Sequence, residues 1–193
     1  ALRPLAGLRQ VADDIAQESF LKAVNGFAGF RPGSNGRSWL ARIVGVIALL
    51  VGVLFAAARF HDGPLGLVPG GALVAGEVVG EPVADWAFAD VDTIEMQLES
   101  QSTSRTTWIL VSEGRAFIPA SLSFPPGKSW HESADVDGRA WLRIAGRRHP
   151  VTLTRVHDEA LRKTLIGVVG SKYGGGPPGD GGVWFFEVVS RAP

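Results

Sequence analysis

The chain has 193 residues, which is enough for one globular domain and a membrane anchor. It contains no cysteine, so disulfides, thiol nucleophiles and cysteine-bound metal sites are excluded. Its 19 Lys and Arg residues balance 19 Asp and Glu residues overall, but residues 60–193 carry twelve basic against sixteen acidic side chains. Because nucleic-acid binding needs clustered positive charge, we expect no nucleic-acid partner.

Residues 1–37 read as an N-terminal arm. Apolar side chains recur at roughly helical spacing, which indicates an amphipathic helix on the cytoplasmic surface of the bilayer or against a partner. These side chains are Leu5, Leu8, Ala12, Ile15, Phe20, Val24 and Phe27. Glycines and a proline between residues 26 and 36 end the pattern. The alternative is a poorly ordered tail.

Residues 38–60 are predicted to form a single transmembrane helix. Residues 43–58 are uninterrupted apolar residues and glycine, and Arg42 and Arg59 flank them seventeen positions apart. That separation is about 25 Å along a helix, close to a hydrocarbon core of about 30 Å. A buried core helix would seldom be apolar on every face. A cleaved signal peptide would not have some forty residues ahead of its apolar core.

The basic residues predict the orientation of this helix. Lys22, Arg31, Arg37 and Arg42 flank its N-terminal side, whereas only Arg59 stands near its C-terminal side. The positive-inside rule places the N-terminus in the cytoplasm and everything beyond residue 60 outside. We therefore expect a bacterial inner membrane protein with a periplasmic C-terminal domain, and a cytoplasmic domain is the alternative.

One face of the helix is lined by small residues at spacings of four, three, four and four. This stripe consists of Ala41, Gly45, Ala48, Gly52 and Ala56. Small residues let another helix approach closely, so the stripe predicts packing against other integral membrane subunits as well as lipid. The plainer explanation is that Gly and Ala are common in membrane helices.

Residues 61–92 are predicted to be a linker and an extended segment that leads into a mainly-β domain at residues 93–193. Alternating apolar residues, tight turns at Glu113-Gly114 and Ala145-Gly146, and an N-cap at Asp158 define its elements. The predicted strands cover residues 93–99, 108–111, 116–118, 141–144, 151–154 and 183–189, with a helix to about residue 172. Five or six short antiparallel strands with one or two helices favour a small barrel.

Several segments resemble a family of bacterial membrane-anchored proteins with the split-barrel fold of pyridoxamine 5′-phosphate oxidases and related flavin- or deazaflavin-binding proteins. The resemblance covers about residues 64–191 and is carried by residues 67–71 (LVPGG), 76–79 (GEVV), 81–90 (EPVADWAFAD), 107–108 (TW), 128–130 (KSW), 142–146 (LRIAG) and 184–186 (WFF). It implies a split-barrel-like β domain behind the membrane helix.

The resemblance also implies a cofactor site for the phosphate of FMN or a deazaflavin. The matching positions are Arg105, Thr106, Thr107, Lys128, Ser129 and Trp130. Where relatives often carry Asp-Pro-Arg, this chain has residues 136–139 (VDGR). This difference weakens the assignment of the family's cofactor site to this chain. The simpler interpretation is a solvated loop that ends in an exposed strand.

Other chemistry has little support in the sequence. Residues 126–129 echo a phosphate loop, but Leu122 stands where its first glycine is required. The four histidines, His61, His131, His149 and His157, show no metal-ligand spacing. We therefore predict no metal site and no catalytic residues, and expect the tryptophans beyond residue 60 to fill the core.

The favoured function is a non-catalytic accessory subunit of a larger bacterial membrane complex, either a photosynthetic reaction centre–antenna complex or a respiratory one. Its helix would pack against partner helices while its barrel covers the outer face, with no cofactor. One alternative is a membrane-tethered flavin-dependent oxidoreductase acting on a quinone or a small periplasmic compound. The other is a periplasmic module that binds a tetrapyrrole or a lipid.

Overall fold

The computed structural model describes residues 36–123, 127–174 and 182–193. The chain divides into two compact units, residues 1–50 and residues 51–193, each of which is described by itself. The amphipathic helix predicted within the N-terminal arm lies outside the described residues, which include only the last two positions of the arm.

The helix α2 runs from Gly36 to Phe60 and confirms the predicted long apolar helix. It is long and apolar enough to cross a membrane, and it is the one helix of that kind among the described residues. Its 25 residues span about 37 Å, more than the thickness of a hydrocarbon core. Every residue of α2 except Ala58 is exposed.

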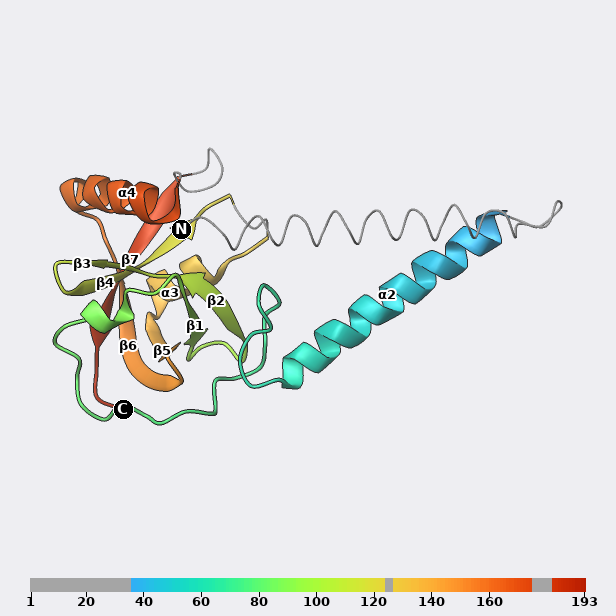
Figure 1. Ribbon diagram of the computed structural model, residues 1–193, viewed down its shortest axis with the longest axis horizontal. Helices are drawn as coiled ribbons and strands as arrows, with labels where there is room; N and C mark the ends of the chain where they lie inside the picture. The colour runs from blue at the N-terminus through green and yellow to red at the C-terminus, as the bar shows by residue number, and fades with distance from the viewer. Residues whose placement is uncertain (1–35, 124–126, 175–181) are drawn as a thin grey trace. The chain divides into compact units, whose positions relative to one another are not determined.

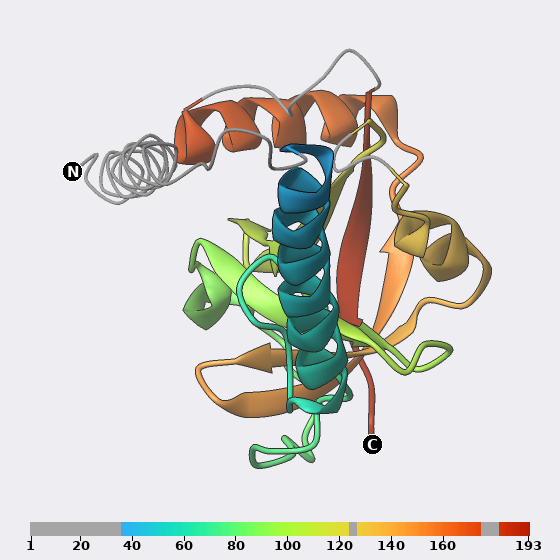
Figure 2. The same ribbon diagram turned by 90° about the vertical axis from the view of Figure 1, so that its right-hand side faces the viewer.

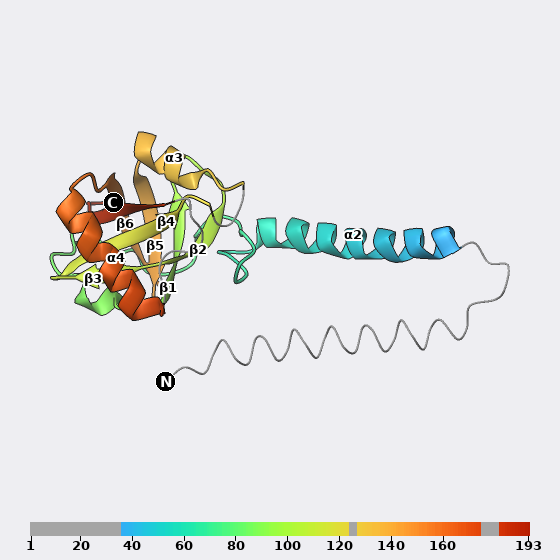
Figure 3. The same cartoon turned by 90° about the horizontal axis from the view of Figure 1, so that it is seen from above.

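A single seven-stranded antiparallel sheet forms the body of the second unit (Figure 1). Its strands are β1 (Thr93–Leu98), β2 (Ser104–Trp108), β3 (Leu110–Ser112), β4 (Arg115–Ser121), β5 (Arg139–Ile144), β6 (Arg147–Arg155) and β7 (Val183–Ser190). They are ordered β2-β1-β5-β6-β7-β4-β3, so the two edge strands are neighbours in the chain, separated only by Ile109. The sheet must curl to bring those edges together, and Figures 1 and 3 show this curled half-barrel.

The mainly-β domain is therefore confirmed, whereas the expected number of strands was too low. Residues 104–108 pair with β1 as a strand of their own, and the predicted strand at residues 108–111 is interrupted at Ile109. The expected closure is also incomplete, because no ladder joins β2 to β3 in the described residues. A break at one residue is invisible to apolar periodicity, since Trp108, Ile109 and Leu110 read as one continuous run.

Both predicted hairpin turns are present. Glu113 and Gly114 connect β3 to β4 with φ values of 53° and 73°, and Ala145 and Gly146 connect β5 to β6 with φ values of 48° and 78°. Two consecutive left-handed residues define the turn that matches the twist of antiparallel strands. These turns fix the register that sends alternate side chains into the curled sheet.

The helix α4 (Glu159–Tyr173) lies over the outside of the half-barrel (Figures 1 and 2). The Asp158 carboxylate accepts hydrogen bonds from the backbone N–H groups of Ala160 and Leu161, which confirms the predicted N-cap. Leu165 and Val169 are buried against a small apolar cluster that includes Phe117 on β4. The short helix α3 (Trp130–Val136) packs against β6 instead.

The main core lies inside the curl. It contains Met96, Leu98, Leu142 and Phe186, all fully buried. Of the tryptophans predicted to fill the core, Trp86 and Trp130 are buried; Trp108 is 37% exposed and Trp141 and Trp184 are half-buried. Trp108 stacks on Tyr173 of α4 with ring centres 4.6 Å apart, which explains how it is accommodated outside the curl.

Residues 61–92 run along the sheet and are bound to it. The backbone of Arg148 on β6 exchanges hydrogen bonds of 2.8 Å with Glu77 and Val79. A short 3-10 turn, η1 (Ala87–Ala89), follows the buried Trp86. This segment therefore belongs to the same packed unit as the sheet.

Candidate functional site

The candidate residues on β2 divide between the two faces of the sheet. Arg105 lies opposite the buried Met96 on β1, so its side chain belongs to the concave face, and Thr107 lies opposite the buried Ile94. Thr106 lies opposite Glu95 on the outer face. The structure therefore groups Arg105 with Thr107 and separates Thr106 from both.

The start of α3 brings the second group of candidates to the concave side. Trp130 is 5% exposed and packs on Phe186 of β7 with ring centres 5.7 Å apart. The guanidinium carbon of Arg105 lies 5.9 Å from the centre of the Trp130 ring, within the range of a cation–π contact. Ser129 precedes α3 and is exposed, and its hydroxyl does not cap the helix.

Arg105 is a half-buried cation whose hydrogen-bonding capacity is incompletely used. Its Nη2 donates to Oε1 of Gln101 at 2.6 Å, a neutral acceptor. Its Nε is buried and has no hydrogen-bond partner, and the described residues offer the guanidinium no ion pair. Burial consequently lowers the pKa of Arg105, because the charged form has lost water without gaining a counter-charge.

Lys128 adds a second positive charge beside Arg105. Its pKa is lowered first by burial and then by the positive charge of Arg105. Two partly desolvated cations that repel each other are unfavourable unless an anion compensates them. This pair is the electrostatic centre of the site.

His131, Arg155 and Trp184 complete the site, although none of them was a candidate from the sequence. His131 is 6% exposed, its Nδ1 is buried without a partner, and its ring meets Trp184 edge-on at 5.1 Å. Burial lowers the pKa of His131, and the charges of Lys128 and Arg155 lower it further, against an opposing effect of Glu132.

Arg155, at the end of β6, covers the Trp184 ring, with its guanidinium carbon 3.4 Å from the ring centre. It also forms an ion pair with Asp135 of α3 at 2.9 Å. We call Arg105, Lys128, His131 and Arg155 the basic cluster. The order of α3, β6 and β7 along the chain does not predict that His131, Arg155 and Trp184 lie together. Their proximity arises from the order of the strands in the sheet.

The chemistry of the basic cluster suits the binding of an anion. Arg and Lys donors recognise phosphate and carboxylate oxygens, and an Nε–H without a partner is available for a further hydrogen bond. The described residues hold no group of three or more His, Asp or Glu side chains that could bind a metal ion. The basic cluster therefore offers an anion positive charge and hydrogen-bond donors.

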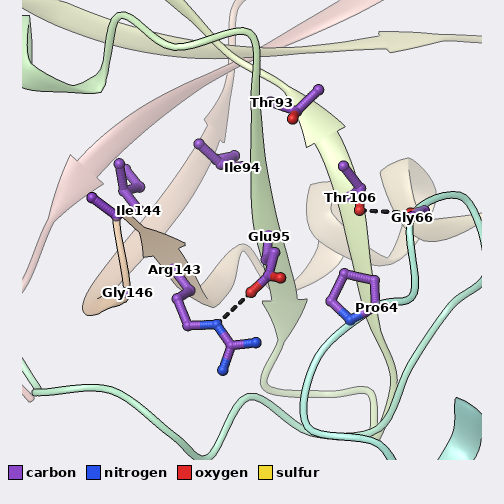
Figure 4. A pocket seen from close by; sticks show the side chains of 10 residues that line it. Pro64, Gly66, Thr93, Ile94, Glu95, Thr106, Arg143, Ile144 and Gly146 are labelled. Atoms are coloured by element: carbon purple, nitrogen blue, oxygen red, sulfur yellow. Dashed lines mark hydrogen bonds and ion pairs between the residues drawn. The ribbon is translucent and has the colours of Figure 1, made fainter.

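The outer face carries a separate groove of about 510 Å³, and Thr106 lies in its wall (Figure 4). Arg143 donates to the carboxylate of Glu95 and, at 2.8 Å, to that of Asp62. It also donates to the backbone oxygens of Asp62 and Ala75 at 3.1 and 3.2 Å. The charges of this groove therefore compensate one another. Because Arg143 binds Asp62 and Ala75, it fastens residues 61–92 to the sheet.

Comparisons with known proteins give one distant neighbour. No family model matches the chain, and no curated protein matches it. A crystal structure from Listeria innocua, provisionally described as a pyridoxamine 5′-phosphate oxidase, is similar with a TM-score of 0.41 and 10% sequence identity. The match covers 54% of this chain and 87% of that one. A similarity of this size assigns neither a cofactor nor an activity.

Proposed function

We propose that this protein is a membrane-tethered domain that binds a phosphate-bearing small molecule at the basic cluster. The observation that carries the proposal is the state of Arg105, a half-buried guanidinium with an orphaned Nε–H and no ion pair in the described residues. Leaving a buried donor unsatisfied costs about 1–3 kcal/mol, and more for a charged group. A bound phosphate would remove that cost.

FMN is the specific ligand that the family resemblance suggests, and its two halves fit the site unequally. The phosphate matches Arg105, whose pKa is lowered by burial, and Lys128, whose pKa is lowered by burial and by the charge of Arg105. The flavin ring has no free aromatic surface among these residues, since Trp130 is buried and Arg155 covers Trp184. The phosphate is therefore the part of the ligand that the residues support, and a flavin-dependent oxidoreductase is the narrower version of the proposal.

A comparison of FMN with riboflavin tests the proposal, because the two differ only in the phosphate. Titration of the full chain in detergent, followed by flavin fluorescence, should show tighter binding of FMN and displacement by inorganic phosphate. Arg105→Met should weaken FMN binding by about 10–100-fold, which corresponds to the loss of one charge-assisted hydrogen bond of about 1.5–3 kcal/mol.

Arg115→Met is the matched control. Arg115 is an exposed arginine on β4 that pairs with Glu187 at 2.7 Å, away from the basic cluster. Equal affinity for FMN and riboflavin, or no binding of either flavin or of phosphate at millimolar levels, would remove the proposal.

The tether is proposed to place the domain on the periplasmic side of a bacterial inner membrane. The support is the length and composition of α2 and the excess of basic residues on its N-terminal side. The chain has no cysteine, so Val136→Cys, at a side chain that is 91% exposed on α3, creates a unique thiol. A membrane-impermeant maleimide should label it in spheroplasts, and labelling only after lysis would reverse the orientation.

A second candidate function is an accessory subunit of a bioenergetic membrane complex, photosynthetic or respiratory. It is supported by the spacing of the small residues of the stripe, among them Gly45 and Gly52, along one face of α2. Close helix packing at such positions is lost when a large side chain is introduced. Mild extraction should yield a complex on native gels that Gly45→Leu and Gly52→Leu disrupt, and a free monomer in every preparation would remove this candidate.

A further inference from the structure

We propose that residues 63–71, which we call the juxtamembrane loop, rest in the interfacial layer of the bilayer with Leu67 and Leu65 in contact with lipid. This inference rests on the membrane tether proposed above. It assigns a lipid-binding surface to the β unit in addition to the spanning helix.

The loop displays apolar side chains and carries no charged residue of its own. Leu67 is fully exposed and Leu65 is 38% exposed, while Phe60 at the end of α2 is 90% exposed. Residues 63–76 contain no Asp, Glu, Lys, Arg or His. An exposed apolar group of this kind in an uncharged stretch is typical of segments that bind the acyl boundary of a membrane.

The exposure of Leu67 is built into the fold. The backbones of Leu65 and Val68 exchange two hydrogen bonds of 3.0 Å, which close a small hairpin around Gly66 and Leu67. The hydroxyl of Thr106 on β2 donates to the carbonyl of Gly66 at 2.7 Å (Figure 4). The loop therefore holds Leu67 outward at a fixed position.

The same loop is bound to the last turn of α2, within one compact unit. The backbone N–H of Gly71 donates to the carbonyl of His61 at 2.9 Å, and a Cβ at Gly71 would lie 2.7 Å from the carbonyl oxygens of Arg59 and His61. Leu65 follows Phe60 by five positions, a reach of at most about 18 Å. With α2 spanning the bilayer, as proposed above, the exposed leucines of the loop lie within that distance of the end of the helix, which makes lipid the occupant that we propose.

The nearest acidic side chain in the sequence, Asp62, has hydrogen-bond partners on both carboxylate oxygens. The Asp62 carboxylate accepts from the backbone N–H groups of Val74 and Ala75 at 2.7 and 3.2 Å and from Arg143 at 2.8 Å. An unpaired carboxylate beside Leu65 would oppose contact with lipid. Because these donors use both of its oxygens, Asp62 leaves the loop free to approach the bilayer.

Spin labels on single cysteines test the inference in the full chain reconstituted into phosphatidylcholine vesicles. Leu67→Cys reports the loop, Val46→Cys reports the middle of α2, and Val136→Cys is the matched control for an exposed apolar residue of the β unit. Accessibility to oxygen, which concentrates in lipid, is compared with accessibility to a water-soluble nickel chelate. Leu67 is fully exposed, so its replacement does not affect folding.

We expect the Leu67 label to have at least tenfold higher oxygen-to-nickel accessibility than the Val136 label, and the Val46 label to be higher still. A Leu67 label as open to nickel as Val136, with Val46 protected, overturns the loop inference and leaves the tether intact. A nickel-accessible Val46 overturns the tether and the loop inference with it. Protection of Leu67 from both reagents would mean that protein covers it, which also overturns lipid contact.

Discussion

The same substitution at two arginines should change stability by different amounts, because the two side chains have different contacts in the fold. Arg143 is 13% exposed and donates four hydrogen bonds, to the carboxylates of Glu95 and Asp62 and to two backbone oxygens. Among the described residues, Arg105 donates one side-chain hydrogen bond, to neutral Gln101, and its buried Nε has no partner. We predict that Arg143→Met is destabilising and that Arg105→Met is nearly neutral.

The magnitudes follow from these contacts. Each charge-assisted hydrogen bond of Arg143 contributes about 1.5–3 kcal/mol, but its carboxylate partners are about one third exposed (32% and 36%), so water replaces part of the loss. Arg143→Met should cost about 2–4 kcal/mol. For Arg105, the loss of the Gln101 contact and of the Trp130 contact is offset by removal of an unsatisfied donor that costs about 1–3 kcal/mol. The net change should lie within about 1 kcal/mol of zero.

Urea unfolding of the full chain in detergent, followed by tryptophan fluorescence, measures both variants. With a slope of about 2 kcal/mol per molar, Arg143→Met should lower the midpoint by about 1–2 M and Arg105→Met by less than about 0.5 M. Equal loss of stability in the two variants would show that Arg105 is a structural cation and not a site for an anion.

Three further predictions concern titration and packing. The chain has a single tyrosine, Tyr173, whose pKa is raised to about 12 by burial and by the charges of Asp92 and Asp90, against an opposing effect of the hydrogen bond to the Ile109 carbonyl. Absorbance titration should give that midpoint in the folded chain and about 10 in urea. A midpoint near 10 in both conditions would contradict the structure. Burial lowers the pKa values of His131 and His149, so folding favours their neutral forms; their contribution to stability is complete above about pH 6.5 and is lost as the pH falls below it. Unfolding free energy in phosphate-free buffer should therefore decline from pH 6.5 to pH 5, before carboxylates titrate, and a flat profile would argue against burial of these rings. Gly138→Ala places a Cβ 2.0 Å from the Leu153 carbonyl oxygen and should lower the free energy of unfolding by about 1–3 kcal/mol. Gly167→Ala, in open space on α4, should raise it by about 0.5–1 kcal/mol. Thermal melting that ranks the two variants the other way would contradict the packing around Gly138.

Local signals in the sequence were sufficient for most of the fold. The Ala145-Gly146 turn, the Asp158 cap and the alternation of Ile94, Met96 and Leu98 each depend on a few adjacent residues, and each is found as expected. The interruption at Ile109 could not be predicted, because it results from the need to pass from one edge of the curled sheet to the other. The extension of β6 to Arg155 is set by its pairing with β7.

The site was only partly accessible from the sequence. The family resemblance grouped Thr106 with Arg105, whereas adjacent residues of a strand face opposite sides, and the pairing of β2 with β1 places them apart. The contributions of His131 and Arg155 were not accessible, because they depend on which strands become neighbours. The desolvation of Arg105 is likewise a tertiary property, produced by its position over Trp130 and by the absence of a carboxylate partner in the described structure.

The central claim concerns one N–H group, and nitrogen-15 NMR of the full chain in detergent micelles observes it directly. The Nε–H resonance of Arg105, assigned by its disappearance in Arg105→Met, should shift on addition of FMN and of inorganic phosphate, while that of Arg143 stays in place. An Arg105 resonance that does not move at saturating FMN and phosphate, or equal shifts at both arginines, would contradict the account.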